Sequence, residues 1–182
     1  MTLEFRRKVF HIISVLLWLL PLFYLSKFLL LVFSFVVLFL NLILVLRVAE
    51  DRFKILYKLV YFFEREKNIE KPAIQALWLN LGVFLSFLFF PKECSMVGII
   101  LTAVGDGFAG LVGYHFGKMR IGEKSLEGFL AFFVSSSLVL LPFLGISALF
   151  VALVGALVEL LPKRIDDNFL LPLVGTATAC II

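Results

Sequence analysis

The amino-acid sequence predicts an all-α polytopic membrane protein, and its composition and its long apolar runs are the observations that predict it. Hydrophobic residues make up 62% of the 182 residues and charged residues 16%, whereas soluble globular chains have roughly 45–50% and about 25%. The apolar runs are continuous rather than alternating, which favours helices over the strands of a membrane barrel. Because the length is that of one domain, we expect a single integral-membrane domain over residues 1–182.

Seven apolar runs are the candidate transmembrane helices, since a span needs about 17–25 apolar residues. The last run has only 14 residues and would reach about 21 Å as a helix, so we expect it to tilt into a thinned region or to be a half-span packed on its neighbours. In order, the runs are Val9–Leu25, Phe28–Leu46, Ala73–Phe90, Cys94–Phe116, Leu126–Leu144, Ile146–Leu161 and Phe169–Ile182.

The basic residues predict the orientation of these helices. Of the 17 lysines and arginines, all except Lys27 and Lys92 lie in the N-terminal segment or in the segments 47–72, 117–124 and 162–168. If seven helices alternate, these segments share one side, which the positive-inside rule assigns to the cytoplasm. We therefore expect a cytoplasmic N-terminus and a cytoplasm-facing site. The net charge of +4 then reflects membrane topology, and we expect no nucleic-acid partner.

The segment Glu50–Lys67 is predicted to be an amphipathic helix in the cytoplasmic interface. The alternative is a plain connector whose charges only set the topology. Apolar residues at helical spacing are Ile55, Leu56, Leu59, Val60, Phe62 and Phe63, and charged residues on the other side are Asp51, Lys54, Lys58 and Arg65.

Asp106 is the strongest candidate site residue, because ionisable groups inside a span are costly and mark functional sites. On a helix, Asp106 shares one face with Gly110, Gly113 and Gly117, which lets a ligand or another backbone approach closely. The alternative is small-residue helix packing with Asp106 paired to a basic residue. Since Asp106 lies about 16 Å of helix from Gly117, the functional interpretation requires a hydrated cavity or a broken helix.

The loop after Gly117 has the composition of a phosphate-binding segment. It carries Lys118, Arg120 and Lys124, and Ser125 is placed to cap the next helix, whose free N–H groups then face an anion. Glu127 in the first turn would either stabilise the helix dipole or hold a metal or a lysine. A lysine-rich cytoplasmic loop is also a common topology signal.

Two further clusters lie at predicted helix ends. Asp166, Asp167 and Asn168 follow Lys163 and Arg164, and two acids with an amide suit Mg²⁺. The alternative is a helix cap by Asp167 or Asn168 with salt bridges to the two basic residues.

At the start of the first run, Arg7 and Lys8 precede His11. The two basic residues are explained equally by topology alone, and a lone interfacial histidine is more often structural than catalytic. We expect Glu159 to be a counter-ion, and Asn41, Gln75 and Asn80 to form hydrogen bonds between helices. The two cysteines, Cys94 and Cys180, show no metal spacing and indicate no disulfide, and we expect no cleavable leader.

Together these motifs resemble the CTP-dependent lipid kinases, which include dolichol or polyprenol kinase, phytol kinase and yeast-type diacylglycerol kinase and are related to the phosphatidate cytidylyltransferases. The resemblance covers most of the chain, although the loop between Lys118 and Lys124 is very short. The matching elements are Asp106-Gly107-Phe108-Ala109 with Gly113 and Gly117-Lys118, Lys124-Ser125-Leu126-Glu127-Gly128, Asp167-Asn168-Phe169 with Pro172, and Arg7-Lys8 with His11.

The resemblance implies transfer of the terminal phosphate of CTP to the hydroxyl of a membrane lipid, releasing CDP. It implies catalytic roles for Asp106, Asp167 and His11, with Asp106 and Asp167 also holding Mg²⁺, and a phosphate or lipid-headgroup contact for Arg7 and Lys8. The implied nucleotide-binding residues are Gly113, Gly117, Lys118, Lys124, Ser125, Glu127 and Asn168.

Two other functions stay open. A cytidylyltransferase would attack the inner phosphate and release pyrophosphate, although the chain shows none of that branch's additional N-terminal spans. A transporter would also explain an intramembrane acid in a glycine-rich helix, although no inverted repeat is visible. The sequence leaves the lipid alcohol and the oligomeric state undetermined.

Overall fold

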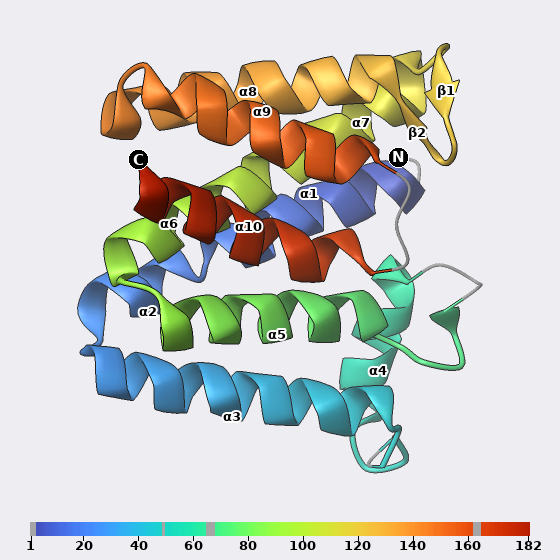
Figure 1. Cartoon of the computed structure of the whole chain (residues 1–182). Helices are drawn as coiled ribbons and strands as arrows, with labels where there is room; N and C mark the ends of the chain where they lie inside the picture. The colour runs from blue at the N-terminus through green and yellow to red at the C-terminus, as the bar shows by residue number, and fades with distance from the viewer. Residues whose placement is uncertain (1–2, 49, 65–67, 162–164) are drawn as a thin grey trace.

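The computed structural model describes residues 3–48, 50–64, 68–161 and 165–182. Its helices lie side by side with their axes near one common direction, and the two ends of the chain lie at opposite ends of this bundle (Figure 1). The predicted all-α class is confirmed, with one short antiparallel hairpin added at the N-terminal end of the bundle.

The bounds of the elements follow the apolar runs closely. A π-helical segment, η2, interrupts the fourth run and ends at Asp106. The elements are α1 Leu3–Leu16, α2 Leu19–Tyr24, α3 Lys27–Val45, α4 Lys54–Phe63, α5 Ile74–Phe89, α6 Lys92–Ile100, η2 Leu101–Asp106, α7 Gly107–Phe116, β1 Arg120–Ile121, β2 Lys124–Ser125, α8 Leu126–Leu144, α9 Ser147–Leu160 and α10 Asp167–Ile181.

Four helical stretches are long and apolar enough to cross a membrane: Leu3–Tyr24, Lys27–Val45, Lys92–Phe116 and Leu126–Leu144. The shorter apolar helices α5, α9 and α10 cover the remaining three predicted runs. The chain is therefore built as an integral membrane protein with four candidate spans, and seven spans stay a prediction.

Close helix packing holds the short α10 in the interior of the bundle. A Cβ at Gly98 of α6 would lie 2.4 Å from the backbone oxygen of Pro172 in α10, so only glycine permits this approach. Leu171 and Thr176 of α10 are fully buried. This burial agrees with the expectation that the last run packs on its neighbours, and it fixes the position of Asp167 at the start of the helix.

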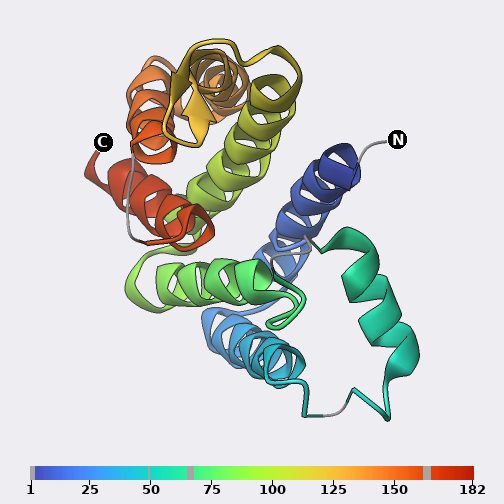
Figure 2. The ribbon, with the colours of Figure 1, turned by 90° about the vertical axis from the view of Figure 1, so that its right-hand side faces the viewer.

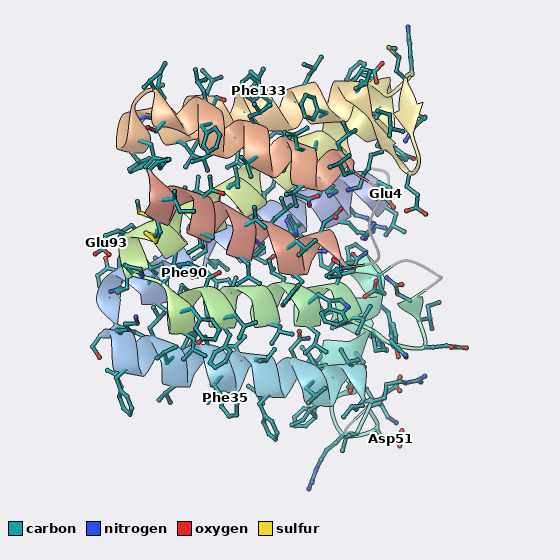
Figure 3. All side chains as sticks on the ribbon, in the orientation of Figure 1. Glu4, Phe35, Asp51, Phe90, Glu93 and Phe133 are labelled. Carbon is teal, nitrogen blue, oxygen red and sulfur yellow. A yellow bond between two sulfur atoms is a disulfide. The ribbon has the colours of Figure 1, made fainter. Side chains whose placement is uncertain are left out.

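The outward faces are apolar between two different polar ends. Phe35 on α3 points away from the bundle and is 56% exposed, whereas charged tips gather at the end that carries Glu4 and Asp51 (Figure 3). At the other end, Lys27 donates to the backbone oxygen of Phe90 at 3.3 Å. An apolar girdle of this kind suits a lipid environment.

A disulfide joins Cys94 at the start of α6 to Cys180 at the end of α10, with their Cα atoms 5.4 Å apart. The expectation of no disulfide was therefore wrong. The two cysteines are 86 residues apart in sequence, and only the antiparallel packing of α6 against α10 brings them together. Sequence spacing carries no information about such a contact.

The segment predicted to be amphipathic forms the helix α4, which is shorter than predicted. It runs across the common axis of the bundle and lies beside α1, away from α8 and α9 (Figure 2). Tyr57 of α4 is buried, and its hydroxyl donates to the backbone oxygen of Leu44 at 3.2 Å. Arg65 and Lys67 lie outside the described residues, and the interfacial location of α4 stays a prediction.

Candidate functional site

Nine of the twelve predicted site residues line one cavity of about 1010 Å³. Its wall is formed by α1, α3, α4, α5, η2, α7, the β hairpin, the first turn of α8, the end of α9, the start of α10 and the described residues Leu161, Ile165 and Asp166 between them. The ionisable side chains on this wall are Glu4, Arg7, Lys8, His11, Glu64, Asp106, Tyr114, Arg120, Glu123, Lys124, Glu159, Asp166 and Asp167.

Asp106 lies on the cavity wall at the end of η2 and is only 6% exposed. Lys8 of α1 donates from Nζ to Asp106 Oδ2 at 2.7 Å and to its backbone oxygen at 3.2 Å. A Cβ at Gly110 would lie 2.0 Å from Lys8 Cε, so this glycine makes room for the lysine. The packing interpretation predicted the basic partner, and the functional interpretation predicted the cavity; the structure contains both.

His11 lies one turn further along α1 and faces the same carboxylate. Its Nε2 is 3.3 Å from Asp106 Oδ2, and this buried nitrogen has no hydrogen-bond partner among the described residues. His11 therefore lies on the cavity wall beside the acid, with its Nε2 buried against the Asp106 carboxylate.

Lys124, on β2, forms a second buried ion cluster. Its Nζ donates to Glu159 Oε1 at 2.6 Å and to Asp167 Oδ2 at 2.5 Å. Burial acts to lower the pKa of Lys124, but the neighbouring carboxylates, including Asp106, outweigh it and hold the pKa above its usual value. The expectation that Glu159 is a counter-ion is confirmed, and its Oε2 is buried without a hydrogen-bond partner in the described part of the chain.

Ser125 and Glu127 hold the hairpin through hydrogen bonds to backbone N–H groups. Ser125 Oγ accepts from the backbone N–H of Gly128 at 3.1 Å, which confirms the predicted helix cap. Glu127 Oε1 accepts from the backbone N–H groups of Lys118 at 3.1 Å and Met119 at 3.3 Å. The carboxylate of Glu127 therefore fixes the start of the loop, and Glu127 lies outside the cavity wall.

The other loop residues divide between the cavity and the surface. Ser125 and Gly113 lie on the wall, and Arg120 extends across it, its Nη2 donating to the backbone oxygen of Gly113 at 3.4 Å. The Lys118 side chain is exposed and Gly117 packs against Ser125, so neither lies on the cavity wall. The nucleotide-binding roles of Lys118 and Gly117 stay predictions, and neither residue lies on the cavity wall.

The start of α10 is capped by Asp166, not by Asp167 or Asn168 as the alternative interpretation expected. Asp166 Oδ1 accepts from the backbone N–H of Asn168 at 2.9 Å and from its Nδ2 at 2.8 Å. This cap leaves Asp167 to face Lys124, and Asn168 stays on the cavity wall. Lys163 and Arg164 lie outside the described residues.

Arg7 is fixed by two side chains that line the cavity with it. Its Nη1 lies 2.9 Å from Glu4 Oε2, and its Nη2 donates to Gln75 Oε1 at 2.7 Å. Gln75 and the Asn80–Asn41 hydrogen bond of 3.2 Å confirm the expected bonds between helices. Glu4 was not predicted, although its spacing of three residues from Arg7 on a helix was a usable signal.

The acids on the wall fit a magnesium ion only together with a phosphate ligand. No group of three or more His, Cys, Asp and Glu side chains in the described ranges is arranged to hold a metal by itself. Mg²⁺ usually takes one or two carboxylates, substrate phosphates and waters. Asp106 and Asp167 are carboxylates of this kind, and in this structure each is paired with a lysine.

The chain is similar to three curated proteins, one of which has a known activity. It is 34% identical to the dolichol kinase of Schizosaccharomyces pombe over 152 residues, which is 76% of this chain and 30% of that kinase. An uncharacterized protein of Methanocaldococcus jannaschii is 41% identical over 61% of this chain, and one of Rickettsia prowazekii is 29% identical over 93% of it.

These similarities are partial. The chain spans 59% of the Methanocaldococcus protein and less than a third of the dolichol kinase. No family model and no solved structure matches the chain. The comparison thus supports a distant relationship to a lipid kinase, and it leaves the nucleotide and the lipid open.

Proposed function

We propose that this protein phosphorylates the hydroxyl group of a membrane lipid alcohol with CTP, releasing CDP. The lipid alcohol is a polyprenol or dolichol, phytol or a diacylglycerol. The observation that carries the proposal is a cavity in an apolar helical bundle whose wall holds two ion clusters, Lys8 with Asp106 and Lys124 with Glu159 and Asp167. The similarity to a dolichol kinase supports the same reaction class.

The ion clusters suit phosphoryl transfer because this reaction depends on positioning and on neutralising charge. Isolated buried charges are costly, so the lysines and acids stabilise each other while the cavity holds no nucleotide. A triphosphate offers Lys8, Lys124 and Arg120 new anionic partners. The carboxylates that these cations release are then available to the metal and to the attacking hydroxyl.

The reaction forms a bond between the lipid oxygen and the terminal phosphorus and breaks the bond from that phosphorus to the bridging oxygen, which leaves with CDP. The hydroxyl proton needs an acceptor near the lipid oxygen. Asp106 and His11 are the candidates, because His11 Nε2 is buried, unbonded and 3.3 Å from Asp106 Oδ2. Asp106 and Asp167 would hold Mg²⁺, which supplies charge neutralisation on the phosphates when bound.

The test uses purified protein in nanodiscs, a panel of lipid alcohols together with phosphatidate, and CTP labelled separately on its first and its terminal phosphate. A kinase transfers only the terminal label to the lipid, whereas a cytidylyltransferase transfers only the first label and releases pyrophosphate. Lys124→Ala should reduce the transfer strongly, while Lys71→Ala, an exposed lysine outside the cavity wall, should not. If neither label reaches any lipid, the proposal is refuted and transport is favoured.

A further inference from the structure

The cavity has an apolar part beside its charged part. The ion clusters described above lie on α1, η2, the hairpin, α9 and α10. The wall formed by α3, α4 and the inner turns of α5, together with Phe10 of α1, is mostly hydrocarbon. Its apolar side chains are Phe10, Leu44, Leu56, Leu59, Val60, Phe63, Ala76 and Leu79.

The few polar side chains in this part already have partners. Asn41 accepts from Asn80 at 3.2 Å, and Ser14 donates to the backbone oxygen of His11 at 3.0 Å. At the margin toward the charged part, Gln75 accepts from Arg7 at 2.7 Å, and Glu64 accepts from the backbone N–H of Ala73 at 2.8 Å. A polar ligand would therefore lose its hydrogen bonds to water there without replacement, which is unfavourable. A hydrocarbon chain has no such loss and gains from leaving water.

Helix α4 forms the outer wall of this part and is apolar on two faces. Leu56, Leu59, Val60 and Phe63 recur at helical spacing on the cavity wall, and Leu56 and Leu59 are still 42% and 54% exposed. Ile55, which is not on the wall, is 86% exposed. A helix with apolar side chains toward both the cavity and the outside suits a position between a bound chain and the bilayer.

Aromatic contacts close α4 onto α1 next to the charged site. Phe10 and Phe63 stack with ring centroids 4.4 Å apart, and the Arg6 guanidinium lies 4.1 Å from the centre of the Phe62 ring. Phe10 directly precedes His11 in the chain. A hydrocarbon chain that extends from a hydroxyl near Asp106 and His11 into the apolar part therefore runs along the Phe10–Phe63 stack, which lines the cavity.

We propose that the apolar compartment between α1, α3, α4 and α5 binds the hydrocarbon chain of the lipid alcohol, and that α4 covers its lateral entrance. This inference rests on the proposed function for the identity of the head group. The volume of about 1010 Å³ lies at the upper end of the range for ligand pockets, roughly 300–1,000 Å³. The cavity therefore has room for a phosphate donor in the charged part and for the first part of a chain beside it.

The test is photolabelling without nucleotide, so that its result does not depend on catalysis. A long-chain alcohol with a diazirine in its chain is incorporated into nanodiscs with the protein, and adducts are mapped with and without excess unlabelled alcohol. We expect competed adducts on α4 and near Phe10. Adducts on the outer face of α3, which report bulk lipid, should not be competed.

Leu59→Trp and Ile55→Trp form a matched pair, because both add an indole to an exposed position of α4 and only Leu59 lies on the wall. Leu59→Trp should lower competed labelling roughly tenfold, about 1.4 kcal/mol of binding, and Ile55→Trp should leave it unchanged. Leu56→Trp repeats the test if Leu59→Trp does not fold.

Equal competed labelling in the two tryptophan variants, or adducts on the outer helix faces only, would overturn the inference. If labelling behaves as expected but no phosphate reaches any lipid, the compartment stands and the proposed kinase reaction fails. If lipid phosphate forms without competed labelling of α4, the reaction stands and the compartment fails.

Discussion

Removing the Lys124 side chain should destabilise the protein, because it leaves two carboxylates without their shared cation. In Lys124→Met, Glu159 and Asp167 lose hydrogen bonds of 2.6 and 2.5 Å. Removing one partner of a buried ion pair costs about 3–5 kcal/mol. The side chain of Lys124 is 30% exposed and that of Glu159 only 4%, so water relieves part of the penalty and we expect about 3 kcal/mol. At about 2–4 °C per kcal/mol, Tm should fall by roughly 6–12 °C.

A double-mutant cycle in detergent, followed by intrinsic tryptophan fluorescence on heating, separates the ion pair from lost packing. Glu159→Gln removes the buried charge that Lys124 neutralises, so Lys124→Met should cost less in the Glu159→Gln background. Coupling energies for contacting residues are about 0.5–3 kcal/mol, and we expect the upper part of this range. Lys71→Met is the control, since substitutions of exposed surface residues change stability by about 0.5 kcal/mol or less.

Additive effects in this cycle, or a Lys124→Met variant as stable as the Lys71→Met control, would refute the reasoning. Either result would show that Lys124 and Glu159 do not interact in the folded protein. The cluster would then not hold the hairpin against α9 and α10, and the shape of the charged part of the cavity would need another explanation.

Other predictions concern charge, the loop and the disulfide. Asp106→Asn should abolish lipid phosphorylation while the protein still inserts and purifies, and normal turnover with an unchanged Mg²⁺ dependence would exclude Asp106 from the site. Lys118→Ala should raise the KM for CTP less than Lys124→Ala does, because only Lys124 lies on the cavity wall; a larger effect of Lys118→Ala would place the nucleotide outside this cavity. The pKa of Lys124 is raised on folding, so its stabilising effect is complete below the ordinary lysine pKa of about 10.4 and is lost as pH rises through the folded value. The Tm difference between wild type and Lys124→Met should therefore not fall as pH rises from about 6 to 9, and a fall over that range would contradict the assignment. Cys94→Ser should lower stability by roughly 2–4 kcal/mol, measured as a Tm loss that reduction of the Cys94–Cys180 bond reproduces in wild type.

The positions of the spanning helices could be predicted from the sequence because each is a continuous apolar run, but the start of α1 could not. The first run was predicted from Val9, whereas α1 begins at Leu3. The prediction excluded the charged residues before Val9 as a cytoplasmic segment. Three of them are helical because they have partners inside the protein: Glu4 pairs with Arg7, and Lys8 pairs with Asp106. Apolar character alone does not detect a helix turn that is stabilised by buried ion pairs.

Asp106 could be identified as a candidate site residue from the sequence, but its ion-pair partner could not. Asp106 stands out because an ionisable side chain within an apolar run costs free energy to bury, and this property can be seen in the local sequence. Lys8 is 98 residues away in sequence, and Lys124 is 35 residues from Glu159; these pairings depend on which helices are neighbours. In the loop, Lys118 and Lys124 were both predicted to bind the nucleotide because both are lysines in a short glycine-containing segment. Only Lys124 lies on the cavity wall, because the hairpin turns it inward.

The two ends of the bundle give independent arguments for the same orientation. The cavity, the hairpin and most of the basic residues lie at one end, which the positive-inside rule assigns to the cytoplasm. The Cys94–Cys180 disulfide lies at the other end, and disulfides persist mainly in oxidising compartments outside the cytosol. Lys92 lies at that end as well, and its Nζ donates to the backbone oxygen of Leu25 at 2.9 Å, so its place there is explained by a helix-end contact. A cysteine at position 120 in a Cys94→Ser/Cys180→Ser background should therefore react with an impermeant maleimide only from the cytoplasmic side. Labelling from the opposite side would place the charged part of the cavity out of reach of cytosolic nucleotide and would rule out the kinase reaction with it.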